Sequence, residues 1–467
     1  MWKIKHLYLK GFLKKKMSRN KDIKIYNISN AFVRIEYNDK VLLCDPWLTN
    51  GIFDKAWMVY PPVYDVDKAI NGVTHVFISH IHKDHCDFNL MRHFPKTTEF
   101  YIPDIFPNDK IKLQLNNLGF NNIHMLPINK DISIGGDMVF NVIPPMNMYG
   151  HETEEMVKAN INGVPLDCGL LLTTEFHKIC ILADDSPYYF DHLTDLHEKL
   201  NKVDLLMLPY NGYAADFPLN FINFSKNQRS ELSHQHSHER MVLQSKFIKK
   251  FKPKNLLLYS SDFALAGPAA KDFYTIHPQK WLDKSLATGL YESHTGIQSH
   301  YLHVGDEMLL NGSIQISRSN DLLPSLEDFA DSIYSDIPNT RFLFKPIDNK
   351  KQLDDVISNA SEHVFSKMEA LDIKSKSSLL IEVTDIEKSY YIDFNEKKLL
   401  DKVKDSPLKL FIESNYLYAL LNFHSHWNDA QISHNLLWCQ EQKYDPTFDT
   451  IINFFHKKIT SKPPTRI

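Results

Sequence analysis

The sequence contains few cysteines, and none of them belongs to a C-x-x-C pair. Only five occur in 467 residues: Cys44, Cys86, Cys168, Cys180 and Cys439. Such scattered thiols indicate a reducing compartment rather than a disulfide scaffold. We therefore predict a cytoplasmic protein.

Long apolar runs and an excess of charge of one sign are missing as well. No apolar run reaches the roughly 18–20 residues that a membrane-spanning helix requires. The formal net charge is −4, so no positive field over the whole chain would attract nucleic acid, and we predict no nucleic-acid partner. Hydrophobic residues make up 43% of the chain and charged residues 24%, as in soluble globular proteins, and the length allows two or three domains.

Residues 1–22 differ from the rest because basic and apolar residues alternate there, and the first acidic residue is Asp22. Two interpretations stay open. The segment is either a solvated basic lead-in or an amphipathic helix in weak contact with an anionic membrane surface. Its apolar part is too short and too interrupted for a secretory signal.

Alternating apolar residues predict strands between short helices over residues 23–315. Strands are expected at 23–48, 99–103 and 168–185, and helices at 88–94 and 111–120. Strand-rich halves flanked by helices fit an α/β sandwich that forms one metal-binding domain. Residues 316–467 begin with a link rich in proline and acidic residues and are expected to form an α+β region with a hairpin at 377–400.

The stretch VFISHIHKDHCD, residues 76–87, places His80, His82, Asp84 and His85 directly after an apolar strand. Imidazoles two positions apart at a strand end can point into one cavity, and a curled loop can bring the other two side chains to a second point. Nitrogen and oxygen donors without a thiolate suit zinc or iron, with manganese as a further candidate. Two ions about 3.5–4 Å apart would share a water or hydroxide that acts as nucleophile. A solvated polar loop is the alternative.

The pattern H-x-H-x-D-H resembles the metallo-β-lactamase superfamily, and LLCDPWL at 42–48 resembles its early Asp-Pro-Trp loop. The resemblance implies a four-layer αββα sandwich whose further ligands come from loops at the same sheet edge. The stretch ICILADDSPYY at 179–189 is similar to the strand that delivers the metal-bridging aspartate. In that register Asp185 is the bridging residue, and Asp184 occupies the place of a glycine.

The resemblance also implies a third histidine for the first metal, and His151 lies at that place, with Asp167 as a rival ligand. The family's last histidine is missing after the apolar stretch 255–268. Asp262 is a candidate substitute, and His277 lies farther along. An oxygen-rich second site would favour iron or manganese.

Longer stretches are similar to the metallo-β-lactamase-type part of the cytidine monophosphate-N-acetylneuraminic acid hydroxylases. They lie at 45–63, 75–85, 206–221, 259–268 and 426–449. That resemblance implies an iron-dependent monooxygenase fed with electrons through a Rieske cluster, which needs two cysteines and two histidines in paired motifs. No such pair occurs in this sequence, so we expect no Rieske cluster. An oxygenase would need a separate electron-transfer partner.

We therefore predict a hydrolase that uses two divalent metal ions and a metal-bound hydroxide on a polar or phosphorylated small molecule such as a sugar nucleotide. Two alternatives stay open: a dinuclear-iron hydroxylase, and a degenerate domain that only binds. His80, His82 and His151 would hold one ion, Asp84 and His85 the other, and Asp185 would bridge them. Asp84 and Asp185 are the expected catalytic residues.

Tyr210, Tyr213 and Tyr259 are candidate substrate-binding residues, although their rings would equally suit a core. A second group of histidines, at positions 234, 236 and 238, is expected in a polar loop ahead of a helix, because a spacing of two does not place side chains on one helical face.

Overall fold

The computed structural model describes most of the chain. The described residues are 21–63, 65–105, 108–143, 167–183, 202–210, 218–260, 262–265, 283–319, 329, 350–401, 408–440 and 447–458. Most of the basic segment 1–22 lies outside them, so both interpretations of it stay predictions. Among the described helices, none is both long and apolar enough to cross a bilayer.

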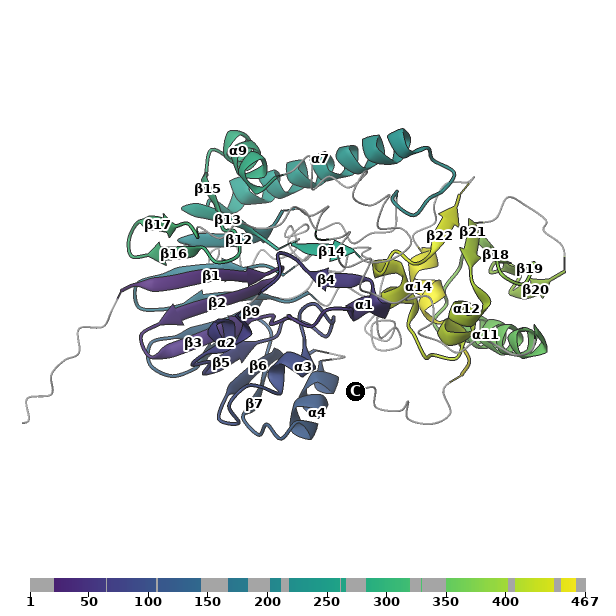
Figure 1. Cartoon of the computed structure of the whole chain (residues 1–467), viewed down its shortest axis with the longest axis horizontal. Coiled ribbons are helices and arrows are strands. Elements are labelled where there is room, and N and C mark those ends of the chain that lie inside the picture. The colour runs from purple at the N-terminus through teal and green to yellow at the C-terminus, as the bar shows by residue number, and fades with distance from the viewer. Residues whose placement is uncertain are drawn as a thin grey trace, which may run out of the picture.

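One sheet of the sandwich begins as an antiparallel meander and continues as a parallel array (Figure 1). Its strands, in spatial order, are β17 (Ile314–Ser317), β16 (Glu307–Leu310), β1 (Ile23–Ser29), β2 (Phe32–Tyr37), β3 (Lys40–Cys44), β5 (His75–Phe77), β6 (Glu99–Pro103) and β7 (Ile123–Leu126). Strands β3, β5, β6 and β7 run parallel, so their carboxyl ends meet at one edge.

The second sheet packs face to face on the first. Its strands, in spatial order, are β15 (Gln298–Tyr301), β13 (Asn255–Tyr259), β12 (Leu205–Pro209), β11 (Lys178–Ile181), β10 (Gly169–Thr173), β9 (Val139–Ile143) and β8 (Asp131–Ser133). All five residues of β12 are buried, which is expected of a parallel strand that is covered on both faces.

Helices cover the outer face of each sheet. On the first sheet they are α2 (Val66–Ile70), α3 (Phe88–Met91) and α4 (Asp109–Asn117), and on the second α7 (Lys226–Phe251) and α9 (Lys284–Thr295) (Figure 1). Separate apolar clusters fill the space between each sheet and its helices. The fold is therefore the predicted αββα sandwich.

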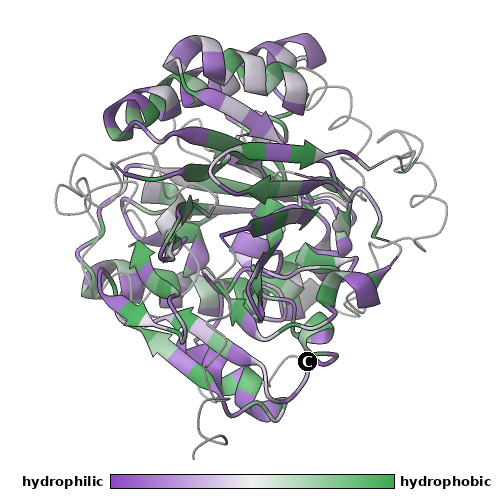
Figure 2. Cartoon of the chain, turned by 90° about the vertical axis from the view of Figure 1, so that its left-hand side faces the viewer, coloured by the Kyte–Doolittle hydropathy of each residue, from purple (hydrophilic) through white to green (hydrophobic). Residues whose placement is uncertain are grey.

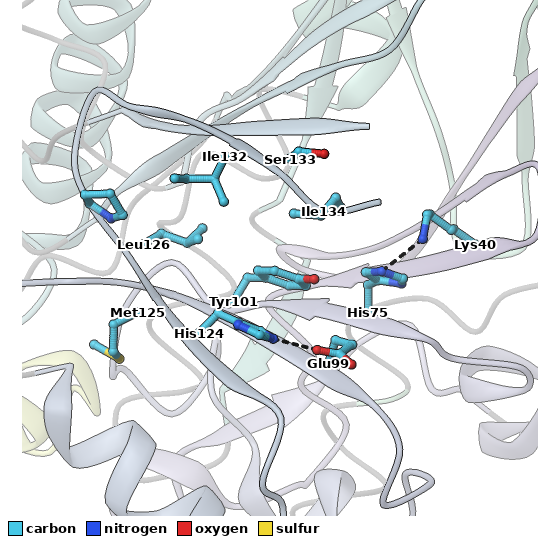
Figure 3. Close-up of a pocket in the computed structure, with 11 residues that line it drawn as sticks. Lys40, His75, Glu99, Tyr101, His124, Met125, Leu126, Ile132, Ser133 and Ile134 are labelled. Atoms are coloured by element: carbon cyan, nitrogen blue, oxygen red, sulfur yellow. Dashed lines mark hydrogen bonds and ion pairs between the residues drawn. The ribbon is translucent and has the colours of Figure 1, made fainter. Parts of the chain in front are cut away.

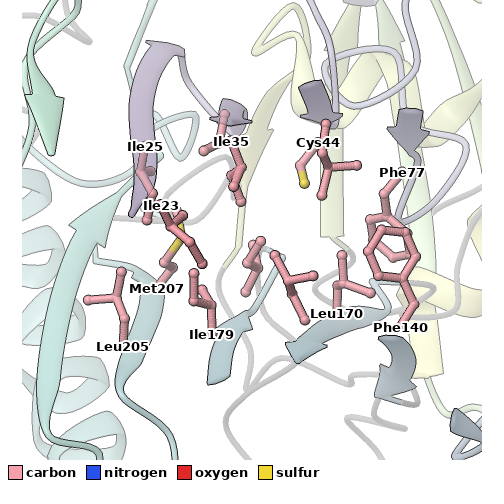
Figure 4. Close-up of a cluster of buried hydrophobic side chains, with 14 of the residues drawn as sticks. Ile23, Ile25, Ile35, Cys44, Phe77, Phe140, Leu170, Ile179, Leu205 and Met207 are labelled. Carbon is pink, nitrogen blue, oxygen red and sulfur yellow. The ribbon is translucent and has the colours of Figure 1, made fainter. Parts of the chain in front are cut away.

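The space between the sheets is filled by branched and aromatic side chains from both (Figure 4). Ile25 and Ile35 of the first sheet and Leu170 and Leu205 of the second are each completely buried. Each such side chain contributes about 1.5–3 kcal/mol on leaving water. In Figure 2 the strands are largely green, whereas purple and green mix on the outer helices.

The C-terminal region forms a second unit with a core of its own. Its sheet contains, in spatial order, β20 (Lys398–Leu400), β19 (Lys388–Asp393), β18 (Ser378–Val383), β21 (Leu408–Ile412) and β22 (Leu437–Cys439). Its helices are α11 (Lys350–Ala370), α12 (Ser414–Leu421), α13 (Trp427–Ile432) and α14 (Thr447–Asn453). The predicted hairpin at 377–400 is present as β18 and β19. The boundary predicted after residue 315 stays a prediction, and β17 extends to Ser317.

A small apolar cluster lies where the C-terminal unit meets the sandwich. It includes the short helix α1 (Ile52–Lys55) and the paired strands β4 (Trp57–Val59) and β14 (Phe263–Leu265). The Trp57 ring stacks on Phe263 with centroids 3.7 Å apart, and its Nε1–H donates to the carbonyl oxygen of Ile432 at 2.9 Å. Two segments distant in sequence are thereby fixed against the C-terminal unit.

One expectation about local structure is wrong. Histidines 234, 236 and 238 lie inside α7 rather than in a loop ahead of a helix. The helix begins earlier because Ser225 and Gln228 form a capping box, and neither proline nor glycine interrupts residues 226–251. His234 and His238, four positions apart, therefore lie on one face of α7, and His236 lies on another.

Candidate metal centre

The histidine motif follows β5 at the carboxyl edge of the parallel strands. His80 and His85 are completely buried, Asp84 is 6% exposed, and His82 is half-buried. The backbone N–H of His85 donates to the carbonyl oxygen of His82 at 3.0 Å, so the loop turns back on itself. As a result the His80 ring lies between its neighbours, with centroids 4.6 Å from His82 and 4.2 Å from His85.

Asp45, which directly follows β3, forms hydrogen bonds to this loop. Its carboxylate accepts hydrogen bonds from Ser79 N at 2.7 Å and Ser79 Oγ at 2.8 Å, and it lies 3.0 Å from Nδ1 of His85. Because a carboxylate accepts, Nδ1 of His85 carries the proton and Nε2 keeps its lone pair. That is the tautomer that a metal ligand requires.

The orientation of His80 is fixed in the same way. Since the Ser79 hydroxyl donates to Asp45, its oxygen accepts from Nδ1 of His80 at 2.8 Å. Nε2 of His80 is then the unprotonated nitrogen, and it faces the site. Burial, together with the neighbouring imidazoles His85 and His82, holds the pKa of His80 well below its usual range, so the ring is neutral.

Three possible metal-ligand atoms lie close together, one each from His80, His82 and Asp167. Nε2 of His80 lies 2.9 Å from Nδ1 of His82 and 3.2 Å from Oδ1 of Asp167. Ligand atoms of His80, His82 and Asp167 all lie within 4.8 Å of one another. Two lone-pair donors at such short separation favour a cation between them, and bonds of about 2.0–2.2 Å from a divalent ion fit this spacing. The donor chemistry therefore fits a metal ion.

Asp84 and His85 form the adjoining part of the cluster. Nε2 of His85 lies 3.3 Å from Oδ2 of Asp84, and Asn30 Nδ2 donates to the same oxygen at 3.2 Å. The hydroxyl of Ser260 in turn donates to Asn30 Oδ1 at 3.1 Å. The carboxylate is thus oriented by a chain of side chains from the β1–β2 turn and the segment after β13.

The Asp-Pro-Trp loop is fastened to the motif by Asp87. Its carboxylate accepts from the N–H groups of Leu48 and Thr49 and from the Thr49 hydroxyl, at 2.8–3.0 Å, while it also caps α3. A single side chain therefore fixes the position of Asp45 relative to the histidines. The mutual placement of the donors is built into the fold.

A family model described as "Beta-lactamase superfamily domain" matches residues 40–259, which include the motif, Asp45 and Asp167. The matched stretch is 220 residues long, somewhat less than half of the chain, and it contains the donor cluster.

Curated relatives match part of the chain. A Mycolicibacterium smegmatis protein, whose name describes it as a Rieske 2Fe-2S iron-sulfur protein, is 26% identical over 42% of this chain and 36% of its own length. The cytidine monophosphate-N-acetylneuraminic acid hydroxylase of Danio rerio is 21% identical over 53% of this chain and 39% of its own length. The chain thus spans less than half the length of these relatives.

Solved structures give only low similarity. The metallo hydrolase Igni18 of Ignicoccus hospitalis has a TM-score of 0.40 at 14% identity, covering 62% of this chain and 98% of its own. CmlA, a diiron β-hydroxylase of Streptomyces venezuelae, has a TM-score of 0.42 at 16% identity, covering 62% of this chain and 54% of its own. Neither value supports a conclusion on function.

Within the matched residues 40–259, the structure brings together four predicted ligands, His80, His82, Asp84 and His85. It also brings in Asp167, the rival of His151 as the third ligand. The close packing of β10 fixes that position: a Cβ at Gly169 would lie 3.1 Å from the carbonyl oxygen of Ile181, so a larger residue would displace the strand. His151 and Asp185 lie outside the described residues, and their roles stay predictions.

Asp262, the candidate substitute ligand, forms an ion pair with Lys284 and accepts from Asn27 at 3.3 Å. Its carboxylate is thus shared with an ammonium group, and its role as a ligand stays a prediction. Tyr213 and His277 lie outside the described residues.

The two described candidate tyrosines occupy the core. Tyr259 is 1% exposed and its hydroxyl donates to the carbonyl oxygen of Leu182 at 2.7 Å. Tyr210 is 6% exposed, packs in the cluster beneath α7, and burial raises the pKa of its hydroxyl well above the usual range. Of the two interpretations, the structure favours a core role over substrate binding for these two.

Two functional residues of the site were not recognised from the sequence. The sequence places Asp45 only in the Asp-Pro-Trp loop and Asn30 only in the strands expected at 23–48. Both have positive φ, 48° for Asp45 and 40° for Asn30, which aims their side chains at the motif. A non-glycine residue in this conformation is uncommon.

The C-terminal unit contacts the metal-binding loop directly. The ammonium of Lys83, inside the motif, donates to Asp429 of α13 at 2.5 Å. Asp54 of α1 lies beside them and accepts from Tyr416 at 2.8 Å and from Ser425 at 2.5 Å. Burial and the charge of Asp429 raise the pKa of Asp54. Burial also acts to raise the pKa of Asp429, but Lys83, His426 and His82 together outweigh it and lower that pKa.

Proposed function

We propose that the β-lactamase superfamily domain of this chain is a metal-dependent hydrolase. The observation that carries this proposal is the convergence of His80, His82 and Asp167 beside Asp84 and His85, with Asp45 fixing the tautomers. Hydrolysis needs only a metal ion, water and positioned side chains. The donors around this cluster are all of the kind that such chemistry uses.

His80, His82 and Asp167 would hold one ion, and Asp84 and His85 would contribute to a second. When bound, such ions lower the pKa of coordinated water towards about 7 and polarise the bond to be broken. Asp45 and Ser79 keep the imidazoles unprotonated at the nitrogens that face the site. Asp84, oriented by Asn30, would accept the proton of the attacking water at a carboxylate oxygen and return it to the leaving group, at oxygen for an ester or phosphoester and at nitrogen for an amide.

The proposed substrate is a small polar molecule with a phosphoester, ester or amide bond, and a sugar nucleotide is one such compound. Attack by water forms the new bond to phosphorus or carbon while the bond to the leaving group breaks. The proton that passes through Asp84 balances the reaction.

A specific observation also favours a second candidate. Relatives from Danio rerio and Mus musculus are named as cytidine monophosphate-N-acetylneuraminic acid hydroxylases. The donor set includes the two carboxylates of Asp84 and Asp167, which iron accepts well. As a hydroxylase the protein would need an electron-transfer partner. A domain that binds without catalysis is the third interpretation.

One experiment separates these functions. The purified protein is reconstituted separately with Zn²⁺, Mn²⁺ and Fe²⁺. Each form is incubated with bis(p-nitrophenyl) phosphate and with CMP-N-acetylneuraminic acid, in the presence and in the absence of a ferredoxin system. The masses of the products are determined by mass spectrometry. The proposal expects cleavage products that have gained the elements of water. Products with one added oxygen atom and no cleavage would favour the hydroxylase.

His82→Ala and Asp84→Asn are the matched controls for both substrates. The proposal expects each variant to lose at least about 100-fold in rate, since each removes a donor from the site. Turnover that persists in both variants, or its absence with every metal, contradicts the hydrolase.

A further inference from the structure

A cavity of about 640 Å³ lies at the opposite edge of the first sheet from the metal centre (Figure 3). It lies beside the amino ends of β5 and β6, along β7 as far as Pro127, and next to β8 and Lys40. His75 begins β5 and precedes His80 by five positions, so the two sites are roughly 15 Å apart along the strand. The volume lies within the range of small-molecule pockets.

One wall of the cavity is a ladder of three rings from neighbouring strands. The rings of His75 and Tyr101 stack at 5.8 Å with 3° between their planes, and those of Tyr101 and His124 at 4.9 Å with 19°. Glu99 accepts from Nε2 of His124 at 2.5 Å. Phe140 packs edge-on against Tyr101 from the second sheet, so the wall is fixed from behind.

At one end of this wall stands Lys40. Because an ammonium can only donate, Nε2 of His75 accepts from Lys40 at 3.3 Å, and Nδ1–H of His75 then donates to the Thr74 hydroxyl at 2.7 Å. That hydroxyl donates in turn to the carbonyl oxygen of Val41 at 3.1 Å. The imidazole is therefore a neutral partner held in one tautomer.

Within the described part of the chain, no carboxylate lies within 4.0 Å of the Lys40 ammonium. Two of its three N–H donors have no partner there, and the group is half-buried at the cavity wall. The other end of the cavity is apolar and is formed by Leu126, Pro127 and Ile132 (Figure 3). A positive group at one end and apolar surface at the other favour an amphipathic anion.

We propose that this cavity binds a small organic acid, with its carboxylate on Lys40 and its hydrocarbon body against Leu126, Pro127 and Ile132. The site is separate from the metal centre and does not depend on the proposed function. A bound acid would supply the counter-ion that the described residues do not provide.

The test is calorimetric titration of the metal-free protein with hexanoate, octanoate and phenylacetate, with 1-octanol as the uncharged match. Removal of the metal ensures that carboxylate binding at the metal centre does not contribute. The proposal expects at least one acid to bind with a Kd below about 1 mM and 1-octanol to bind about 10- to 100-fold more weakly, as the loss of a charge-assisted hydrogen bond predicts.

Lys40→Met should weaken acid binding by the same factor, whereas Lys374→Met, at an exposed lysine of the C-terminal unit, should leave it unchanged. His82→Ala, at the metal centre, should also have no effect. Failure of all three acids to bind, equal affinity for acid and alcohol, or unchanged binding in Lys40→Met would each overturn the proposal.

Discussion

Asp45 decides which nitrogen of His85 faces the metal centre, although it is not itself among the converging donors. A carboxylate behind a ligating imidazole fixes its tautomer and raises its basicity, and loss of such a partner typically reduces metal affinity by about 10- to 100-fold. The same carboxylate holds Ser79, which orients His80. Both histidines thus depend on one side chain.

We therefore expect Asp45→Asn to lower metal affinity by about 10- to 100-fold, because the amide can donate to Nδ1 of His85 and so favour the wrong tautomer. Affinity is measured by competition with a chromogenic chelator. Asp204→Asn, which affects a carboxylate bonded to Lys178 N and Lys254 at the other sheet, is the matched control. Equal affinities in the two variants would show that Asp45 has no such role.

His75 gives a second prediction for a single residue, and it concerns pH. Burial, reinforced by the charge of Lys40, lowers its pKa to about 4. Between about pH 6.5 and pH 4 the unfolded chain binds a proton that the folded protein does not, so stability falls as the pH falls through this window and is unaffected above it.

In Lys40→Met the charge is gone, so we expect the pKa of His75 to move upward. The acid loss of stability should still begin near the unfolded pKa of about 6.5, but it should end at a higher pH and be smaller in total. Titration of the His75 ring protons by NMR measures the pKa, and urea unfolding from pH 4 to pH 7 measures the stability. A pKa that stays near 4 in the variant would assign the whole effect to burial.

At the scale of elements, α1 is unusual because its last three residues are left-handed. Phe53, Asp54 and Lys55 have φ values of 47°, 53° and 65°. Each such residue costs roughly 1–2 kcal/mol, so surrounding contacts have to hold the turn. Asp54 supplies them through Tyr416 and Ser425 of the C-terminal unit.

Asp54→Ala should therefore destabilise the protein by about 1–3 kcal/mol, since two buried hydroxyls lose their acceptor. Lys55→Gly is the informative counterpart: this side chain is exposed, and glycine tolerates positive φ, so we expect stability to rise by about 0.5–1 kcal/mol. Both values come from urea unfolding curves. A destabilised Lys55→Gly would mean that the left-handed turn carries no strain.

The elements themselves were largely predictable, because apolar periodicity marks β1 to β3, β10, β11, β18 and β19 directly. The start of α7 was missed since its polar histidines suggested a loop, although the Ser225–Gln228 capping box was readable. The motif could be predicted as a donor cluster from its density of histidines. The roles of Asp45 and Asn30 could not be predicted. Asp45 contacts a residue 40 positions away and Asn30 one 54 positions away, and neither these contacts nor a positive φ can be recognised from the local sequence.

For the molecule as a whole, the C-terminal unit contacts the loop that carries the metal ligands. Lys83 stands between His82 and Asp84, and its ammonium is bound by Asp429 of α13. The Asp429 side chain is 16% exposed and that of Lys83 45%, so the pair is stronger than a surface salt bridge but still partly screened. A unit outside the matched domain thereby holds a segment of the metal centre.

We expect Asp429→Asn and Lys83→Met each to weaken metal binding by about 3- to 10-fold, and the double variant to be no worse than either single one, because both break one interaction. Asp429→Glu, which keeps the charge, should restore most of the metal affinity.

The d–d spectrum of the Co²⁺ protein reports whether the geometry of the metal ligands has changed. A loss of folding stability alone would not alter this spectrum. Asp372→Asn, at an exposed pair with Lys374, is the control. Additive losses in the double variant, or an unchanged spectrum and affinity in Asp429→Asn, would mean that the C-terminal unit only rests on the loop without shaping the metal centre.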